Sequence, residues 1–377
     1  PRERSARFAV NDACDRCTRR SWLIGRLSAH LDQIRGNRPA IRGVLALSDR
    51  KLIASLGGRE QGRITAQWER LDPAAQRQQW QSASTFAICR HSRSFPRSLG
   101  DLPDPPAVLH LYGARDRFDH LISSSASVAV VGARRASADG LELARELGRT
   151  LSLCGVTVIS GMALGIDSAA HEGALAAGAQ TVAVLACGPE RAYPARRKRL
   201  HSELAERAVV VSELPPGIAP YRWAFPARNR IIAALAQMAV VVEAAERSGS
   251  LITAEIAADL GRAVGAVPGH PSSWHSSGAN ALLRDGAHLI RDARDILDDA
   301  FGVENVGSPS ASREPLPLPP DLSGDQKAVI AALDAGFSTV ARVAEYCAGV
   351  AEVVAPLTEL ELLGVVERHS DGNYKRL

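Results

Sequence analysis

The sequence predicts an α/β fold in which a doubly wound, mainly parallel sheet occupies residues 95–302 of the 377-residue chain. From Val128 onward, short apolar runs alternate with segments of helical spacing, and this alternation indicates right-handed βαβ crossovers. The first run, Val128–Gly132, carries no charge, as expected of a strand buried on both faces. The strand-like runs are 128–131, 156–159, 181–185, 208–211, 239–242, 263–267 and 287–290, and the helical ones include 141–151, 165–177, 226–236, 250–260 and 278–284. The predicted architecture is therefore an extended Rossmann-like domain.

Residues 1–94 predict a small basic helical domain. Helical patterns such as Trp22–Ile34 and Val44–Leu56 are separated by glycine turns, including Gly57-Gly58. This organisation suggests a SAM-like or helix-hairpin-helix domain that touches DNA backbones, although a packing domain with a basic face would explain the same facts. Residues 95–113 are expected to form a proline-rich lead-in and a short edge strand.

The C-terminal part predicts a linker and a winged-helix module. Residues 303–324 are rich in proline and serine, which is typical of a linker. Residues 325–377 show three helical patterns, near 325–333, 339–347 and 351–363, followed by a hairpin turn at 370–373. Residues 301–377 carry 6 basic and 11 acidic side chains. Because acidic side chains outnumber basic ones, we expect this module to contact a protein rather than to bind DNA strongly.

Charge is unevenly distributed along the chain. Residues 1–100 carry 19 basic and 8 acidic side chains, whereas residues 101–300 carry 20 and 22. The central part nevertheless concentrates arginine and lysine in two runs, at 191–199 and 222–230. Placement of this kind is a better indication of an anionic partner than the net charge of +4.

The composition also indicates which cellular compartment and which cofactors to expect. No apolar run approaches the roughly 20 residues of a membrane span, and the N-terminal PRERSARF has no apolar signal core, so we expect a cytoplasmic protein without a membrane partner. Six cysteines do not make a disulfide framework. Cys14 and Cys17 form a lone C-x-x-C, with Cys89 and His91 as distant possible zinc ligands. Without a second close pair, we expect no metal and no cofactor.

The turn after the first strand has the chemistry of a phosphate site. Gly132 permits a sharp turn, and Ser137 is a good N-cap for a helix that starts near Ala138. The N–H groups at the start of a helix attract anions, and Arg134 and Arg135 stand in the same turn. An ordinary βα turn with solvated arginines is the alternative interpretation.

Two other strand ends carry small polar clusters. Ser160-Gly161 is followed by Asp167 and His171, which together suggest a hydrolase. No G-x-S-x-G motif is present and both residues share one helix, so we favour a structural role for them. Ser248-Gly249 opens a later helix and predicts either a second anion site or a plain cap.

The segment FPARNRII, residues 225–232, is the most distinctive. Arg228 and Arg230 flank Asn229 at a helix start, a charge density that is unfavourable unless an anion or an acidic partner lies opposite. Phe225, with Tyr221 and Trp223 before it, alternates with arginine, as in proteins that stack single-stranded bases and bind their phosphates. These rings could instead pack two domains together.

Several blocks resemble the DNA-processing protein A (DprA/Smf) family in order and spacing. They are GARRAS (132–137), SGMALGIDSAAHEGAL (160–175), the Tyr193-Pro194 loop, SELPPG (212–217), FPARNRII (225–232), EAAERSGSLITA (243–254), VPGH (267–270) and GANALLRDGA (278–287). The resemblance spans roughly residues 95–300, and the 325–377 tail resembles the winged-helix module of some members.

This resemblance implies a homodimer that binds incoming single-stranded DNA, shields it from nucleases and loads a RecA-type recombinase during natural transformation, without turnover chemistry. By match to the family's motifs, Arg134 is the best candidate for a phosphate contact. The expected DNA-binding residues are Gly132, Arg134, Ser160, Gly161, Lys198, Phe225, Arg228, Asn229, Arg230, Ser248, Gly249 and Thr253. Leu164 stands where the family usually has arginine, which puts one basic contact in doubt.

Two enzyme classes are the alternatives to DNA binding. An NAD-dependent dehydrogenase should show G-x-G-x-x-G, where this chain has GARRAS. A phosphoribohydrolase of the Lonely Guy type is the closer alternative. Its PGGxGT-type loop with a following glutamate is missing, and VPGHPSSW stands where that loop would be expected.

Overall fold

A computed structural model describes residues 13–33, 43–113, 115–123, 126–302, 319, 322–334, 337, 340–347, 353–368 and 374–376. By internal contacts the chain divides into two compact units, Pro1–Pro309 and Ser310–Leu377.

In the part of the first unit that the structure describes, nine strands form one sheet, in the order β1-β2-β6-β5-β4-β3-β7-β8-β9. The strands from β6 to β9 along this order are parallel, whereas β2 pairs antiparallel with both β1 and β6. This arrangement confirms the predicted doubly wound, mainly parallel sheet. The strands are β1 (Thr85–Cys89), β2 (Val108–Gly113), β3 (Ser127–Val131), β4 (Thr157–Ser160), β5 (Thr181–Leu185), β6 (Val209–Ser212), β7 (Met238–Val241), β8 (Ala263–Ala266) and β9 (His288–Leu289).

The structure differs from the sequence prediction at one side of the sheet. The short edge strand expected within residues 95–113 is β2, but β2 has a partner on each side because β1 adds beyond it. Strand β1 was not predicted, since its residues fall within the segment assigned to the helical domain. The sheet therefore extends into the N-terminal part of the chain.

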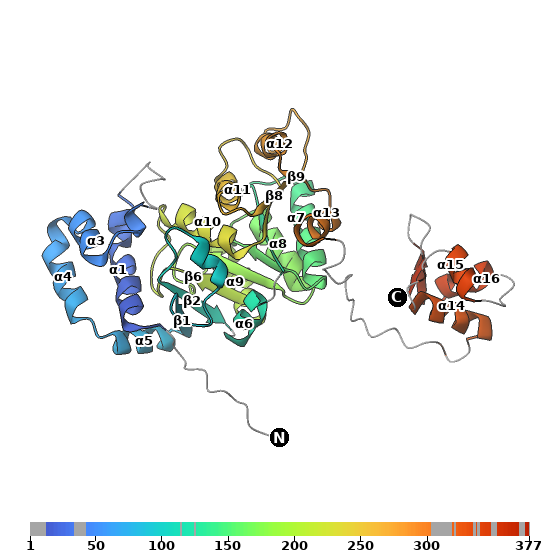
Figure 1. Cartoon of the computed structure of the whole chain (residues 1–377), viewed down its shortest axis with the longest axis horizontal. Coiled ribbons are helices and arrows are strands. Elements are labelled where there is room, and N and C mark those ends of the chain that lie inside the picture. The colour runs from blue at the N-terminus through green and yellow to red at the C-terminus, as the bar shows by residue number, and fades with distance from the viewer. Residues whose placement is uncertain are drawn as a thin grey trace, which may run out of the picture. The chain divides into compact units, whose positions relative to one another are not determined.

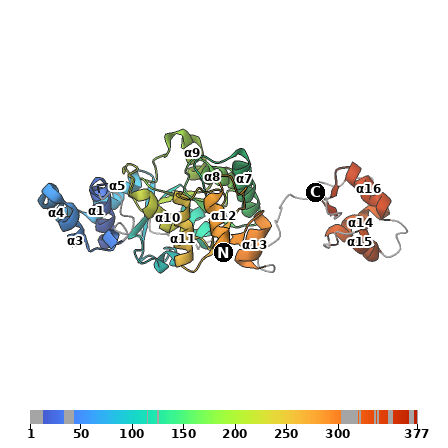
Figure 2. The ribbon, with the colours of Figure 1, turned by 90° about the horizontal axis from the view of Figure 1, so that it is seen from above.

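Helices cover both faces of this sheet (Figures 1 and 2). Alternate residues of β3 point to opposite layers: Ala129 and Val131 belong to one core cluster, Val128 and Val130 to the other. The first layer contains α6 (Arg115–Ser123), α10 (Ala224–Leu235), α11 (Gly249–Asp259) and α12 (Ser277–Arg284). The second contains α7 (Ala138–Leu153), α8 (Ile166–Ala176), α9 (Lys198–Arg207) and α13 (Ala293–Phe301), and the short helices η2 (Arg97–Asp101) and η3 (Ala195–Arg197) lie in connections.

The N-terminal helices pack beside β1 and β2, in blue in Figure 1. The hydroxyl of Ser21 lies 2.7 Å from His110 Nε2 of β2, and Trp80 packs with Ala87 and Val108 of the first two strands. The described elements are α1 (Asp15–Leu31), α3 (Asp49–Leu56), η1 (Gly58–Glu60), α4 (Gln61–Arg70) and α5 (Pro73–Ser82). The described residues between 13 and 82 are thus mainly helical, and they pack directly on the sheet.

The second unit contains α14 (Gly324–Asp334), α15 (Val340–Tyr346), α16 (Val354–Leu362) and the antiparallel pair β10 (Val366–Arg368) and β11 (Tyr374–Arg376). Its core includes Val329, Leu357 and Tyr374. Three helices followed by a hairpin match the predicted winged-helix pattern. Most of the predicted linker, 303–324, and the turn at 370–373 lie outside the described residues. Among the helices described in either unit, none is long and apolar enough to cross a membrane.

Candidate nucleic-acid interface

The main cavity lies where the strand order reverses. After β3 the chain builds β4, β5 and β6 on one side, and then returns to place β7 on the other side of β3. The loops that follow β3 and β7 therefore diverge, and ligands in such sheets bind in the crevice between them. A cavity of about 850 Å³ is lined by residues 131–135 after β3 and by residues 245–253 after β7.

Four exposed arginines line this cavity: Arg134, Arg135, Arg222 and Arg247. They come from the turn after β3, the segment before α10 and the loop before α11. The carboxylates in the lining are Asp32 and the buried Asp167. Because the exposed guanidinium groups outnumber the carboxylates, the cavity favours an anionic ligand.

The turn after β3 is fixed by the end of β7. The N–H of Ala133 donates to the carbonyl of Glu243 at 2.7 Å, and a side chain at Gly132 would lie 2.9 Å from the same carbonyl oxygen. The Glu243 carboxylate accepts the Ser137 N–H at 2.9 Å, while the Ser137 hydroxyl accepts from the N–H of Gly140 and caps α7, as predicted. Arg134 therefore extends from a backbone held on both sides.

Phe225 lies next to Arg134 in the cavity wall. The guanidinium carbon of Arg134 is 5.3 Å from the centre of the Phe225 ring. The centres of the Tyr193 and Phe225 rings are 5.5 Å apart, and the two ring planes are tilted relative to each other. Phe225 is half-buried, whereas Trp223 is buried and donates its indole N–H to the carbonyl of Ser28 at 2.9 Å. Trp223 thus packs the N-terminal helices against the sheet domain, and Phe225 faces the cavity.

Arg228 is buried at the floor of the cavity. Its Nη1 donates to the carbonyl oxygens of Gly161 and Val184 at 2.7 and 2.6 Å, and its Nε donates to Asn229 Oδ1 at 3.2 Å. Asn229 in turn donates to the carbonyl of Gly249 at the start of α11. Burial lowers the pKa of Arg228, and the nearby Asp167 acts in the opposite direction. Arg228 therefore holds the ends of β4 and β5 together beneath the ligand space.

The groups that suggested a hydrolase do not form a triad. Ser160 Oγ donates to the carbonyl of Val130 at 2.6 Å, and the Asp167 carboxylate accepts the N–H of Gly161 at 3.1 Å. The Thr181 hydroxyl donates to Val158, so it accepts from Nδ1–H of His171 at 2.7 Å. Burial raises the pKa of Asp167 and lowers that of His171 to about 3. Each group thus stabilises the fold around the β4 loop.

The structure brings most of the predicted DNA-binding residues together. Those that line the main cavity are Gly132, Arg134, Phe225, Arg228, Asn229, Ser248, Gly249 and Thr253. Gly161 lines a smaller adjoining cavity of about 90 Å³. Leu164 also lies in the smaller cavity, so the position at which the family usually has arginine is apolar here.

Three predicted residues lie elsewhere. Ser160 is buried in the sheet. Lys198 is exposed at the start of α9 and outside the cavity lining. Arg230 is 1% exposed and binds two carboxylates, Glu213 at 2.7 Å and Asp104 at 3.3 Å. Its charge is thus compensated within the fold.

Sequence reasoning missed part of the cavity wall. Trp274 is 63% exposed and lies 3.9 Å, centre to centre, from the ring of His275, and both residues line the cavity. In the sequence, VPGH (267–270) indicates a resemblance to the family and VPGHPSSW a departure from an enzyme loop, and neither marks Trp274 as part of a cavity wall. Arg247 was also overlooked, although its place directly before Ser248 marks it as part of the same helix start.

Comparisons with known proteins show which family the chain resembles. Residues 86–301 match the family model described as DNA recombination-mediator protein A, and residues 313–372 match the DprA winged helix domain. A putative DNA processing protein DprA of Mycobacterium tuberculosis is 41% identical over 276 residues, which cover 72% of this chain and 69% of that protein. Protein Smf of a Synechocystis strain is 29% identical over 94% of both chains.

Two solved structures are also similar. DNA processing protein A from Streptococcus pneumoniae superposes with a TM-score of 0.61 at 28% identity, covering 77% of this chain and 99% of that one. The protein of the same name from Helicobacter pylori, whose structure concerns its single-stranded DNA binding mode, gives a TM-score of 0.52 at 27% identity and covers 57% and 94%.

Proposed function

Because the chain belongs to the DNA recombination-mediator protein A family, we propose that it binds single-stranded DNA at the cavity beside β3 and β7. The observation that carries this proposal is the set of four exposed arginines, Arg134, Arg135, Arg222 and Arg247, around one cavity at the strand ends. Guanidinium groups bind backbone phosphates through paired N–H donors.

The aromatic residues extend the proposal to the bases. Phe225 and the exposed Trp274 line the same cavity as the arginines. Unpaired bases stack on such rings, and each stack contributes about 1–3 kcal/mol. Paired bases cannot reach the rings, so we expect single strands to bind more tightly than duplex.

The role that we infer for the protein after it binds a strand is based on its family. We infer that a cytoplasmic homodimer protects the incoming strand from nucleases and loads a RecA-type recombinase on it during natural transformation, without turnover chemistry. The acidic winged-helix unit then serves a protein contact.

Arg134→Ala tests the phosphate site. We expect weaker binding of a fluorescent oligonucleotide and a salt slope that is smaller by about 0.7, the contribution of one single-strand phosphate contact. Arg149→Ala is the matched control because Arg149 is half-exposed on α7, pairs with Glu146 and lies outside the cavity lining. Equal affinity and equal salt slope in the two variants would remove Arg134 from the phosphate site.

The alternative function, a phosphoribohydrolase, can be tested by a separate assay. A cavity of about 850 Å³ is large enough to hold a mononucleotide, so nucleotide binding would not separate the two functions. Release of free base from nucleoside monophosphates, lost in Arg134→Ala, would instead support a phosphoribohydrolase. We expect no such release.

A further inference from the structure

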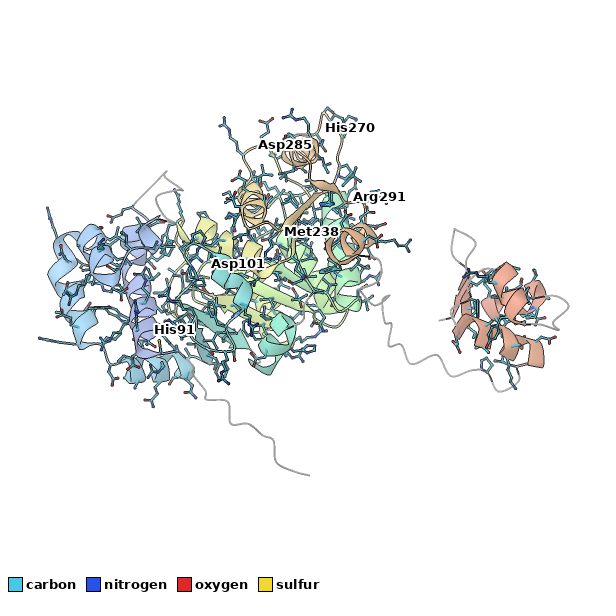
Figure 3. The ribbon with its side chains drawn as sticks, in the orientation of Figure 1. His91, Asp101, Met238, His270, Asp285 and Arg291 are labelled. Atoms are coloured by element: carbon cyan, nitrogen blue, oxygen red, sulfur yellow. The ribbon has the colours of Figure 1, made fainter. Side chains whose placement is uncertain are left out.

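Four potential metal ligands lie together where the start of α1 meets the end of β1. They come from two pairs of residues that are about 75 positions apart in the chain. Cys14 is the N-cap of α1 and Cys17 lies in its first turn. Cys89 is the last residue of β1, and His91 follows in the turn beyond it. Figure 3 labels His91 on the side of the sheet where the N-terminal helices lie. The start of α1 therefore lies beside the end of β1, which brings together residues that are distant in the sequence.

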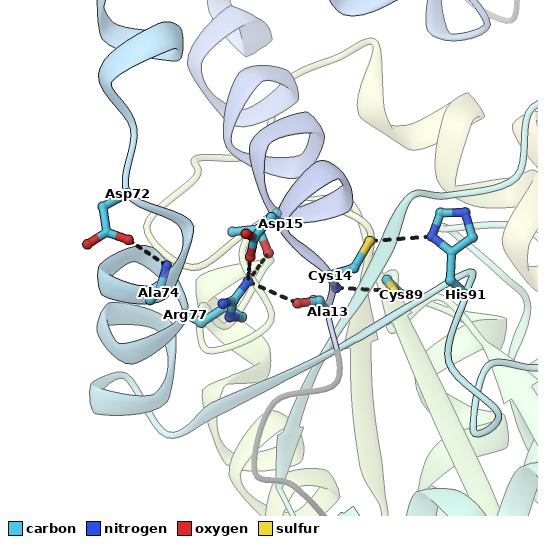
Figure 4. Close-up of polar contacts among 9 residues, drawn as sticks. Ala13, Cys14, Asp15, Asp72, Ala74, Arg77, Cys89 and His91 are labelled. Carbon is cyan, nitrogen blue, oxygen red and sulfur yellow. Dashed lines mark hydrogen bonds and ion pairs between the residues drawn. The ribbon is translucent and has the colours of Figure 1, made fainter.

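The ligand atoms have the spacing of one coordination shell. The three Sγ atoms and one histidine nitrogen all lie within 4.8 Å of one another. His91 Nδ1 is 3.4 Å from the Sγ of both Cys14 and Cys17, and Figure 4 shows the first of these contacts. In a tetrahedral zinc site with bonds of about 2.3 Å to sulfur and about 2.0 Å to nitrogen, sulfur and nitrogen lie about 3.5 Å apart.

We propose that Cys14, Cys17, Cys89 and His91 bind one zinc ion in a closed, tetrahedral Cys₃His site. None of these three described cysteines is in a disulfide, so each can supply a thiolate and release its proton to solvent on binding. Three thiolates and an imidazole form a soft donor set that suits zinc better than magnesium or calcium. Four protein ligands leave no position for a substrate, so the ion is structural.

One backbone donor already faces the cluster. The N–H of Cys14 donates to Cys89 Sγ at 3.4 Å, the kind of contact that orients a metal-bound sulfur. The start of α1 is also held without a metal, because Arg77 binds Asp15 at 2.7 Å and the carbonyl of Ala13 at 3.1 Å (Figure 4). The donors are therefore positioned before an ion arrives.

The ion would anchor the N-terminal helices to the sheet. Helix α1 has 17 residues, so its far end lies about 25 Å from the ligands. That end carries Asp32, which lines the main cavity and accepts the N–H of Trp223 at 3.2 Å. Zinc at Cys14 would thus fix one end of a helix whose other end forms part of the proposed DNA site.

Metal content gives the direct test. The full chain is purified with a removable tag that contains no histidine, dialysed into metal-free buffer and analysed by elemental mass spectrometry and by native mass spectrometry. We expect one zinc ion per chain. Removal of the ion by a strong chelator should lower the melting temperature of the wild-type chain.

Two variants and a control assign the ligands. Cys17→Ser and His91→Ala should lose the zinc, whereas Cys154→Ser should retain it, because Cys154 is a half-buried free thiol outside the cluster. His91 is exposed, so its variant should fold even if Cys17→Ser does not. The chelator should have no effect on the melting temperature of His91→Ala.

Cobalt supplies a readout of geometry that does not depend on any variant. Cobalt(II) added to the metal-free wild-type chain should give the intense visible bands of a tetrahedral site and a thiolate charge-transfer band. Wild-type protein with no stoichiometric metal and three reactive thiols would overturn the proposal. So would a disulfide between two of these cysteines, or iron in place of zinc.

Discussion

At the scale of single residues, the arginines of FPARNRII have two different tasks. Successive helix residues are rotated by about 100°, so Arg228 and Arg230 are separated by about 200° and face opposite directions. Arg228 points to the strand ends and binds the carbonyls of Gly161 and Val184, whereas Arg230 points to Glu213 and Asp104. The phosphate contacts thus fall to exposed arginines such as Arg134.

Gly161 is the residue that makes room for Arg228. A Cβ atom at position 161 would lie 1.9 Å from Arg228 Nη1, so Gly161→Ala should displace the guanidinium from its two carbonyl partners. Hydrogen bonds to a charged group contribute about 1.5–3 kcal/mol each, so we expect the free energy of unfolding to fall by about 2–3 kcal/mol. Urea unfolding followed by circular dichroism measures this.

Gly62→Ala is the control for that substitution. Nothing lies within 4 Å of a Cβ atom at position 62, which is exposed in α4, so its unfolding midpoint should match that of the wild type or exceed it. If Gly161→Ala were as stable as Gly62→Ala, the buried arginine would have no part in holding the β4 and β5 ends.

At the scale of elements, the sequence predicted the parallel strands from β3 to β8 well because each is a short apolar run between turn residues. It missed β1, since the run Thr85–Cys89 follows a helical segment and gives no local sign of its partner β2. The site was predicted where one motif supplies both backbone and charge, as at Arg134. Trp274 joins the cavity through long-range packing, which no local pattern reveals. The four possible zinc ligands can be named from the sequence, but only the fold shows that their ligand atoms lie within 4.8 Å of one another.

Two buried histidines connect elements to the sheet and should make stability depend on pH. His110 of β2 contacts Ser21 of α1, and His171 of α8 contacts Thr181 of β5. Burial lowers both pKa values from 6.5 to about 3. The unfolded chain therefore takes up protons first as the pH falls, so their stabilising contribution is full above pH 6.5 and is lost towards pH 3.

The expected change can be measured by urea unfolding. When the pH is lowered from about 7.5 to about 5.5, the free energy of unfolding should fall by about 1.4 kcal/mol for each histidine that stays neutral in the folded state. Asp167, whose pKa is raised by burial, acts in the opposite sense. His171→Asn can still donate to Thr181 but does not titrate, so its loss should be smaller than that of the wild type by about 1.4 kcal/mol. His201, whose pKa is also lowered by burial, contributes equally to both proteins. An unchanged pH dependence in this variant would exclude His171 as a source.

At the scale of the whole molecule, the two units differ in net charge. Residues 310–377 carry 6 basic and 10 acidic side chains, so removing them leaves a more basic fragment. The cavity, its arginines and the proposed zinc ligands all belong to Pro1–Pro309. DNA binding should therefore reside in this unit, and the acidic unit should affect it only through long-range repulsion, which salt screens.

A truncation series tests this division. The fragment 1–309 should melt at the temperature of the first unit in the full chain and should bind single strands at least as tightly at low salt, with the difference vanishing at high salt. A fragment that starts at residue 114 lacks β1 and β2, which leaves β6 as an unpaired edge and removes the contact between His110 and the N-terminal helices. We expect that shorter fragment to aggregate on size exclusion and to lose its cooperative melting. If instead it melted with 1–309 and bound DNA equally, the N-terminal segment would be a separate domain, and the continuity of the sheet through β1 and β2 would not matter for the site.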